Sequence, residues 1–345
     1  MYSWKDNRVK LFSVIMLAAL SGNIVTPVYA ELSSLEGVTA LNRRGKHLEA
    51  VAEFRKLSAE QNTLAVKIAA AQSAWAAGVV DLSRDLWTEI LANRDFKGIE
   101  RHRAVLALAI LELQENNPER ARYLAEQVLP EVQTSDLKAQ LLLLIGESLT
   151  EQGLHSKAEG YYQEAAQVGN DVLRSEAKFL YGENQLSLGR TEGARKSFTE
   201  VETASEYAPQ ALFQLIKIDL DQGQYNGVLT WIKEGREEFP MQFEDSWIRY
   251  ANIIALANTK QLNQCVEELK TFKARYSDQD TWYVLANSEY EGKELVAELD
   301  RLNKKESPTL TTAELALADL ATVAVPTKKT VVTKKTAMTT KKSKK

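Results

Sequence analysis

The segments GLHSKAEGYY, residues 153–162, and GRTEGARKSF, residues 189–198, share three residue types at the same spacing. Each has a glycine, an alanine five residues later and an aromatic residue four residues after that. Taking the glycine as an anchor, the spacing recurs along the chain in steps of 33 to 38 residues. Self-similarity at a period in the thirties is typical of stacked helical repeats.

The three positions have different physical tasks in a pair of helices joined by a tight turn. The anchor ends the first helix in a left-handed conformation, which glycine adopts without strain. The residue five positions later is small, because the second helix passes closest to the first there, and the residue nine positions later fills the groove between them. The anchors are Gly45, Gly78, Asn116, Gly153, Gly189, Gly223 and Lys260. The small residues are Ala50, Ser83, Ala121, Ala158, Ala194, Val228 and Cys265. The residues at the third position are Phe54, Trp87, Ala125, Tyr162, Phe198, Ile232 and Leu269.

The composition favours helices. The chain has 345 residues, of which 44% are hydrophobic and 26% charged, with only 16 glycines and seven prolines. No stretch alternates β-branched and polar residues between turn signals, as a strand would. The sequence therefore predicts an all-α protein.

The pattern resembles the tetratricopeptide repeat family. Gly146 and Gly182 lie seven residues before their anchors, as in that family's helix–turn–helix unit, and the match covers about Leu35 to Tyr276. Asn116 and Lys260 depart from the glycine of the family's turn. The resemblance implies a right-handed α-solenoid of about seven repeats, whose first helices line a concave face. Such proteins generally bind peptides, helices or other proteins and rarely catalyse reactions.

The first thirty residues have the order of an export signal. Three basic residues precede the apolar run LFSVIMLAAL, and VTPVYA ends with small residues two apart. We expect cleavage after Ala30, with an uncleaved membrane anchor as the alternative. The expected domains are then a signal over 1–30, a solenoid over 31–280, capping helices over 281–305 and a low-complexity tail over 306–345.

The end of the chain is basic, whereas the rest is acidic. The whole chain carries −4, residues 1–30 carry +2 and the segment after Pro326 carries +8, so the body between them carries −14. Such a Lys/Thr-rich segment cannot bury enough apolar surface to fold, and we expect disorder. Its lysines could contact an anionic polymer or lipid, or only solubilise the chain. They are Lys328, Lys329, Lys334, Lys335, Lys341, Lys342, Lys344 and Lys345.

The sequence contains no recognisable catalytic pattern. The histidines are His47, His102 and His155; two fall in equivalent turns of different repeats, and we expect them to be solvated. Phosphate-binding and nucleophile-elbow motifs are absent from the sequence. Cys265 cannot form a disulfide within the chain, and its small-residue position identifies it as a buried hydrophobe. The prediction is a protein without catalytic activity, metal or cofactor.

The candidate binding face lies on the first helices expected over 136–152, 173–188 and 209–222. Leu142, Ile145 and Leu149 should point inward. Residues a part-turn further round should line the hollow. They are Gln140, Leu143, Glu147, Glu176, Phe179, Glu183, Gln210, Phe213 and Lys217. An aromatic such as Phe179 or Phe213 could anchor a partner, or could pack against the neighbouring repeat.

Two functional hypotheses remain. The first is a protein-interaction scaffold in the cell envelope of a Gram-negative bacterium, with a peptide or protein as its partner. The second is an envelope organiser whose basic tail binds an anionic surface while the solenoid acts as a spacer. A hydrolase accessory domain differs from the first only in its partner, and nucleic acid is disfavoured by the export signal.

Overall fold

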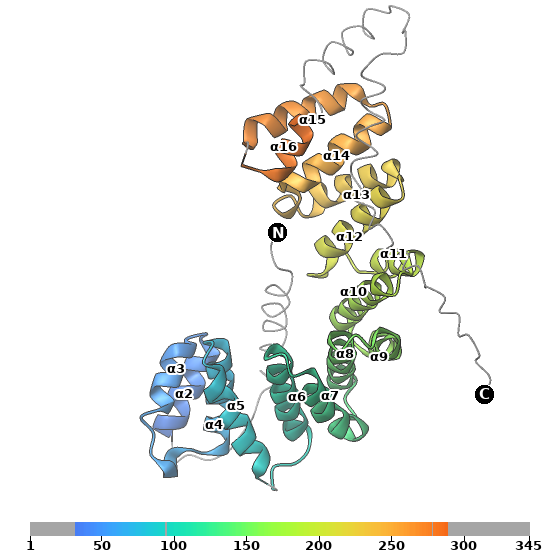
Figure 1. The fold of residues 1–345 in the computed structure, drawn as a ribbon. Coiled ribbons are helices and arrows are strands. Elements are labelled where there is room, and N and C mark those ends of the chain that lie inside the picture. Colours follow the sequence, from blue (N-terminus) through green and yellow to red (C-terminus); the bar gives the residue numbers. More distant parts are fainter. Residues whose placement is uncertain (1–31, 94, 278, 289–345) are drawn as a thin grey trace, which may run out of the picture. The chain divides into compact units, whose positions relative to one another are not determined.

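A computed structural model describes residues 32–93, 95–277 and 279–288 of the chain. The expected export signal, residues 289–305 of the expected cap and the basic tail lie outside these described residues. Within them, the chain forms helices and no strand, so the all-α solenoid class is confirmed (Figure 1). None of the described helices is both long enough and apolar enough to cross a membrane.

The helices form antiparallel pairs along the chain (Figure 1). The pairs are α2 (Leu32–Arg43) with α3 (His47–Phe54), α4 (Leu64–Ala76) with α5 (Val80–Ala92), α6 (Ile99–Gln114) with α7 (Pro118–Val128), α8 (Ser135–Glu151) with α9 (His155–Val168), α10 (Asp171–Ser187) with α11 (Thr191–Thr199), α12 (Ala208–Asp221) with α13 (Tyr225–Glu238), and α14 (Ser246–Asn258) with α15 (Leu262–Arg275). Short 3-10 turns η1 (Ala59–Gln61), η2 (Leu129–Glu131) and η3 (Gln242–Glu244) precede α4, α8 and α14, and α16 (Thr281–Ser288) follows the last pair.

The chain divides into two compact units at Ala211 and Leu212, within α12. The first unit contains α2 to α11 and the first turn of α12. The second contains the remainder of α12 and α13 to α16.

All seven anchors adopt the left-handed conformation expected of them. Their φ angles are 71, 75, 63, 72, 74, 67 and 59° in chain order, so Asn116 and Lys260 turn the chain as the glycines do. At Gly153, the next amide, of Leu154, donates to the carbonyl of Leu149 over 2.8 Å. The amide that follows Lys260 makes the same bond to the carbonyl of Leu256 over 2.9 Å. This pattern is a Schellman motif, which satisfies the carbonyls left open at a helix end.

The small position of each pair lies at a tight helix crossing. All seven of its residues are at most 1% exposed. At two of them a side chain reaches the backbone of the partner helix twelve residues earlier: the Ser83 hydroxyl donates to the Ala71 carbonyl over 2.8 Å, and the Cys265 thiol to the Ile253 carbonyl over 3.8 Å. The interpretation of Cys265 as a small buried hydrophobe is confirmed.

The third position fills the groove in six of the seven pairs. Trp87, Ala125, Tyr162, Phe198, Ile232 and Leu269 are buried, whereas Phe54 near the start of the described chain is half-exposed. The residue seven before each anchor is buried as well, and it is small where its partner is large: Gly146 accompanies Tyr162 and Gly182 accompanies Phe198. The fourth and fifth pairs are therefore closed by two residues of complementary size, whereas the third pair has alanine at both positions, Ala109 and Ala125.

Candidate interaction surface

The first helices of the central repeats lie where the sequence places them. Helices α8, α10 and α12 begin and end within two residues of the expected ranges. Leu142, Ile145 and Leu149 are buried, as expected for the side that faces the second helix of the pair. The residues expected to line the hollow differ in how far their side chains are exposed to solvent.

Four of the nine candidate residues are buried, and their assignment to an accessible binding face is wrong. Leu143 and Phe179 are 1% exposed, Glu176 is 2% exposed and Glu147 is 5% exposed. Burial to this degree excludes direct contact between these side chains and a protein partner in this conformation.

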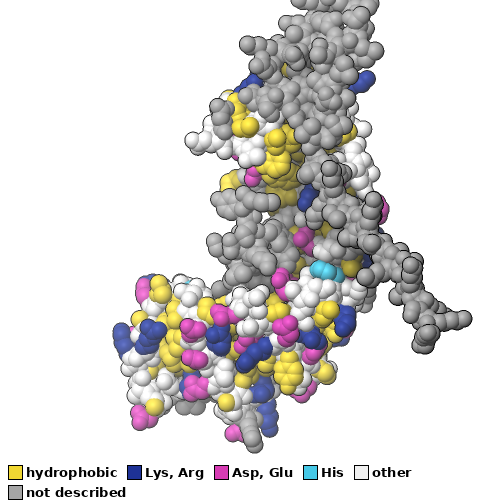
Figure 2. All heavy atoms as spheres, in the orientation of Figure 1, with side chains coloured by type: hydrophobic (Ala, Val, Ile, Leu, Met, Phe, Trp, Pro, Cys, Tyr) yellow, Lys and Arg dark blue, Asp and Glu magenta, His cyan; other side chains and the backbone are white. Residues whose placement is uncertain are grey.

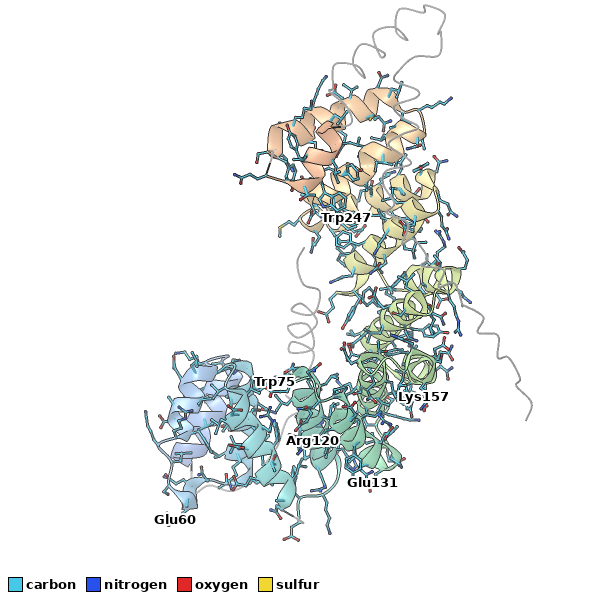
Figure 3. All side chains as sticks on the ribbon, in the orientation of Figure 1. Glu60, Trp75, Arg120, Glu131, Lys157 and Trp247 are labelled. Carbon is cyan, nitrogen blue, oxygen red and sulfur yellow. The ribbon has the colours of Figure 1, made fainter. Side chains whose placement is uncertain are left out.

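The aromatic candidates pack against the segment that begins the next repeat. Phe179 lies ten residues before its anchor, and its ring centroid is 5.3 Å from that of Tyr207, which precedes α12. In the second unit, Phe213 occupies the equivalent position. Its ring centroid lies 4.7 Å from that of Phe243 and 5.8 Å from that of Trp247, which Figure 3 labels. These contacts confirm the interpretation that both rings pack against the neighbouring repeat. Leu143 is the equivalent residue of the preceding repeat.

The remaining candidates retain exposed surface. Gln140, Glu183 and Gln210 in the first unit are half-exposed, as is Phe213 in the second unit, where Lys217 is exposed. They are the members of the predicted face that can still meet a partner.

A buried carboxyl group interrupts the face on α10. The Tyr207 hydroxyl donates a hydrogen bond to Glu176 Oε1 over 2.8 Å. Burial, followed by the negative charge of Glu147, raises the pKa of Glu176 to about 8, although the bond from Tyr207 opposes the rise. Glu176 therefore retains its proton at neutral pH and presents no negative charge to a ligand.

The polar side chains that join successive repeats were not found by sequence reasoning. Asn184 on α10 is 1% exposed; its amide nitrogen donates to the carbonyl of His155 over 2.9 Å, and its oxygen lies 3.0 Å from His155 Nδ1. In an earlier repeat, the Trp75 indole donates to Gln114 Oε1 over 3.1 Å (Figure 3). No sequence signal separates these residues from solvated ones, since each bond joins positions about one repeat apart.

The sequence predicted solvated side chains for the turn histidines His47 and His155, and this prediction is wrong for His155; it made none for His102. His155 is half-buried against Asn184, and His102 is 8% exposed with Nε2 3.3 Å from Glu131 Oε2. Neither belongs to a metal centre, because the described residues contain no group of three His, Cys, Asp or Glu side chains that could hold an ion.

Charges of both signs are interspersed on the surface. Figure 2 shows lysine, arginine, aspartate and glutamate side chains mixed over the first helical pairs, without a field of one sign. A surface of this kind suits solubility and specific contacts better than nonspecific attraction to a polyion.

Residues 143–209, which contain most of α8 and all of α9, α10 and α11, match the family model of the tetratricopeptide repeat. This segment is similar to the tetratricopeptide repeat family. Proteins built from such helix–turn–helix units generally bind other proteins and generally do not catalyse reactions. Sequence comparison with curated proteins gives no significant match.

Solved structures with similar helical arrays include tetratricopeptide-repeat proteins. The MamA structure from AMB-1 is 15% identical, covers 50% of this chain and 89% of its own, and has a TM-score of 0.41. A Rap protein complexed with Competence and Sporulation Factor is 15% identical, covers 85% of this chain and 97% of its own, and has a TM-score of 0.44. The Cut9–Hcn1 hetero-tetramer of APC/C is 15% identical, covers 92% of this chain and 63% of its own, and has a TM-score of 0.41.

Proposed function

We propose that the protein is a non-catalytic scaffold of the cell envelope that binds a peptide or protein on the first helices of its tetratricopeptide repeats. The proposal rests on the different roles of the residues within each helical pair. The anchor, the small residue and its large partner are committed to the turn and the crossing, as the seven left-handed turns and the buried crossing residues indicate. The half-exposed positions of the first helices lie outside the turn and the crossing, and we assign recognition of the partner to them.

The best candidates for contact in the first unit are Gln140 on α8 and Glu183 on α10. Both are half-exposed and lie on helices of the segment that matches the family. Together they offer an amide and a carboxylate, a pair that suits the backbone amides and basic side chains of a peptide. We therefore expect the partner to carry a basic residue opposite Glu183.

Site-specific crosslinking in intact cells tests this proposal. A photoreactive residue replaces Gln140 or Glu183 in the full chain, and the control replaces Glu119, an exposed residue in the first turn of α7 on the second helix of its pair. The proposal expects one discrete adduct from positions 140 and 183, and none from 119. Adducts of equal yield from all three positions, or from 119 alone, would contradict the assignment of the face.

The export of the protein is part of the same proposal. It rests on the signal-like order of residues 1–30, and the mature chain should begin near Glu31. Mass spectrometry of the native protein measures its N-terminus. An intact Met1 in a membrane fraction would support the uncleaved anchor, and an intact Met1 in the cytoplasm would refute export.

The second candidate function is an envelope organiser whose basic tail does the binding. It is favoured by the separation of charge between a body of −14 and a tail of +8. Truncation after Pro326 separates the two functions. Crosslinks from position 183 that survive the truncation support the scaffold, whereas loss of envelope attachment with intact crosslinking assigns the attachment to the tail.

A further inference from the structure

The start of α16 repeats the start of α14. The sequence DSWIRYAN begins at Asp245, and DTWYVLAN begins at Asp280. Each of these aspartates caps its helix in the same way: Asp245 Oδ1 accepts from the Trp247 amide over 3.3 Å, and Asp280 Oδ1 accepts from the Trp282 amide over 3.0 Å. The two tryptophans therefore occupy the same position in two helices of the second unit.

Each of the two tryptophan rings rests on an aromatic ring of an earlier helix. The ring centroid of Trp247 is 5.8 Å from that of Phe213 on α12 (Figure 3). The ring centroid of Trp282 is 5.2 Å from that of Tyr250 on α14. Helix α16 packs on α14, and packed helices lie about 8–10 Å apart. Equivalent side chains of the two helices should therefore be separated by about the same distance.

Both tryptophans keep exposed surface and a hydrogen-bond donor. Trp282 is 39% exposed, and Trp247 is half-exposed. The indole of Trp231 in the same unit donates to Asp219 Oδ2 over 2.8 Å. In contrast, the indole N–H groups of Trp247 and Trp282 donate to no acceptor in the described part of the chain. An aromatic side chain that is already held in place can bind a ligand with little loss of conformational entropy.

The charge beside the two tryptophans is negative. Asp245 is exposed and Asp280 is half-exposed, and neither forms an ion pair with a residue that the structure describes. The sequence over 212–288 has eight basic and eleven acidic residues, which gives a net charge of −3. Such a surface repels an anionic polymer and favours a partner that brings a basic residue.

A segment in the polyproline II conformation fits both the spacing and the donors. This conformation has three residues per turn and rises about 3.1 Å per residue, so side chains three residues apart point the same way at intervals of about 9 Å. Its backbone carbonyls make no internal hydrogen bonds and can accept from indole N–H groups. Proline maintains this conformation before binding, which lowers the entropy lost on association.

We propose that Trp247 and Trp282 form a docking site for a proline-rich segment of a partner protein. Prolines three residues apart pack on the two rings, and a basic residue of the same segment pairs with one of the two capping aspartates. The site lies in the second unit and uses neither Gln140 nor Glu183, so it is independent of the binding face proposed for the first unit.

Fluorescence anisotropy of a labelled polyproline peptide that begins with arginine tests the proposal on the full chain. Trp247→Ala and Trp282→Ala should each weaken binding about tenfold or more, because each removes one ring and one donor. Trp75→Ala is the matched control. This half-exposed tryptophan of the first unit donates its indole N–H to Gln114, and its loss should leave the affinity unchanged.

Two further measurements separate recognition from folding. Trp282→Phe keeps an aromatic ring on Tyr250 but removes the indole N–H, so it should melt as the wild type does and lose less affinity than Trp282→Ala. A Gly/Ser peptide that begins with the same arginine should bind the wild type about tenfold more weakly or worse, because it does not hold the polyproline II conformation before binding.

Three results would overturn the proposal. The first is the absence of saturable binding of the polyproline peptide to the wild type. The second is equal affinity for the polyproline and Gly/Ser peptides, or an equal loss of affinity in Trp75→Ala and Trp282→Ala. The third is tryptophan-dependent binding of a chito-oligosaccharide that the polyproline peptide does not displace, because this would assign the two rings to a glycan. Crosslinking from positions 140 and 183 tests the first unit separately from all three.

Discussion

The ring of Tyr162 lies against the backbone of Gly146, so closely that a Cβ atom at position 146 would be 2.6 Å from Tyr162 Cε1. Gly182 and Phe198 repeat the relationship one unit later, at 2.7 Å. These contacts explain why a helix-weakening residue stands in the middle of α8 and of α10. The glycine makes room for the ring that closes the pair.

Gly146→Ala should therefore destabilise the protein by roughly 1–3 kcal/mol, although alanine is the better helix former. In a Tyr162→Ala background the same change should be neutral or stabilising, because the ring that it meets is gone. Urea unfolding of the four variants measures the coupling. Gly160→Ala is the matched control, since a Cβ on that exposed helical glycine meets nothing within 4 Å. If Gly146→Ala and Gly160→Ala changed the free energy of unfolding equally, the space beside Gly146 would not limit the residue at that position.

Lys260→Gly should stabilise the second unit. Lys260 has a φ of 59°, a conformation that costs a residue with a side chain about 1–2 kcal/mol and glycine little. Part of this gain is offset by the greater freedom of glycine in the unfolded chain, so we expect about 1 kcal/mol or less. Lys270→Gly, within α15, should instead lower stability by about 1 kcal/mol. Denaturant unfolding compares the two, and a loss of stability in Lys260→Gly would contradict the turn assignment.

Phe179→Ala should cost about 3–5 kcal/mol of stability, because it empties a site between Phe198 and Tyr207. Phe213→Ala should cost less, since the Phe213 side chain keeps some exposure. Thermal melting measures both. Crosslinking from position 183 at a temperature where the variants are folded should be unaffected by either change. A Phe179→Ala variant that melts normally but loses the crosslink would restore Phe179 to the binding face.

The protonated carboxyl of Glu176 predicts a stability that falls as the pH rises. Its pKa is raised from 4.5 to about 8 in the folded protein, so between these values the folded state holds a proton that the unfolded state releases. The contribution of Glu176 to stability is present in full below pH 4.5 and is lost as the pH passes through about 8. Glu176→Gln keeps an acceptor for Tyr207 but does not titrate.

Melting temperatures of wild type and Glu176→Gln should accordingly diverge above neutral pH. The variant should be the more stable at pH 9, and the difference should shrink or reverse at pH 5. Glu119→Gln, an exposed substitution of the same chemistry, should follow the wild type throughout. A difference between Glu176→Gln and wild type that is independent of pH would show that Glu176 is ionised in the folded protein.

The thiol of Cys265 should be unreactive in the folded protein. It is 1% exposed, and burial together with the charge of Glu268 raises its pKa to about 12, so that almost no thiolate is present at pH 8. A thiol reagent should label no cysteine in native protein and one equivalent in urea. Rapid labelling of the native protein would mean that α14 and α15 separate readily.

The repeat architecture could be predicted because its determinants are local. The turn, the crossing and the groove are set by residues within sixteen positions of each other, so spacing alone located all seven turns, those at Asn116 and Lys260 included. The binding face could not be located as well. Helical periodicity shows which residues share a side of α10, but whether that side meets solvent depends on Tyr207, which lies 31 residues from Glu176.

The same limit applies to the joints between repeats. Asn184 and His155 are polar residues at positions that vary between repeats. From the sequence alone, each would be predicted to face solvent. Only the three-dimensional stacking brings them together. The pattern within a pair therefore predicts how that pair closes, whereas the contacts between pairs need the structure.

The complementary closing residues also constrain how the array can have grown. A genetic crossover within a turn that joined α8 to α13 would set Gly146 opposite Ile232 and leave a void. The reciprocal product, α12 joined to α9, would press Tyr162 onto Ile216. A crossover in a connection between two helical pairs would keep the two closing residues of each pair together. Duplication and exchange of gene segments should therefore have moved whole helical hairpins. The two residues that close a hairpin would then have been inherited together.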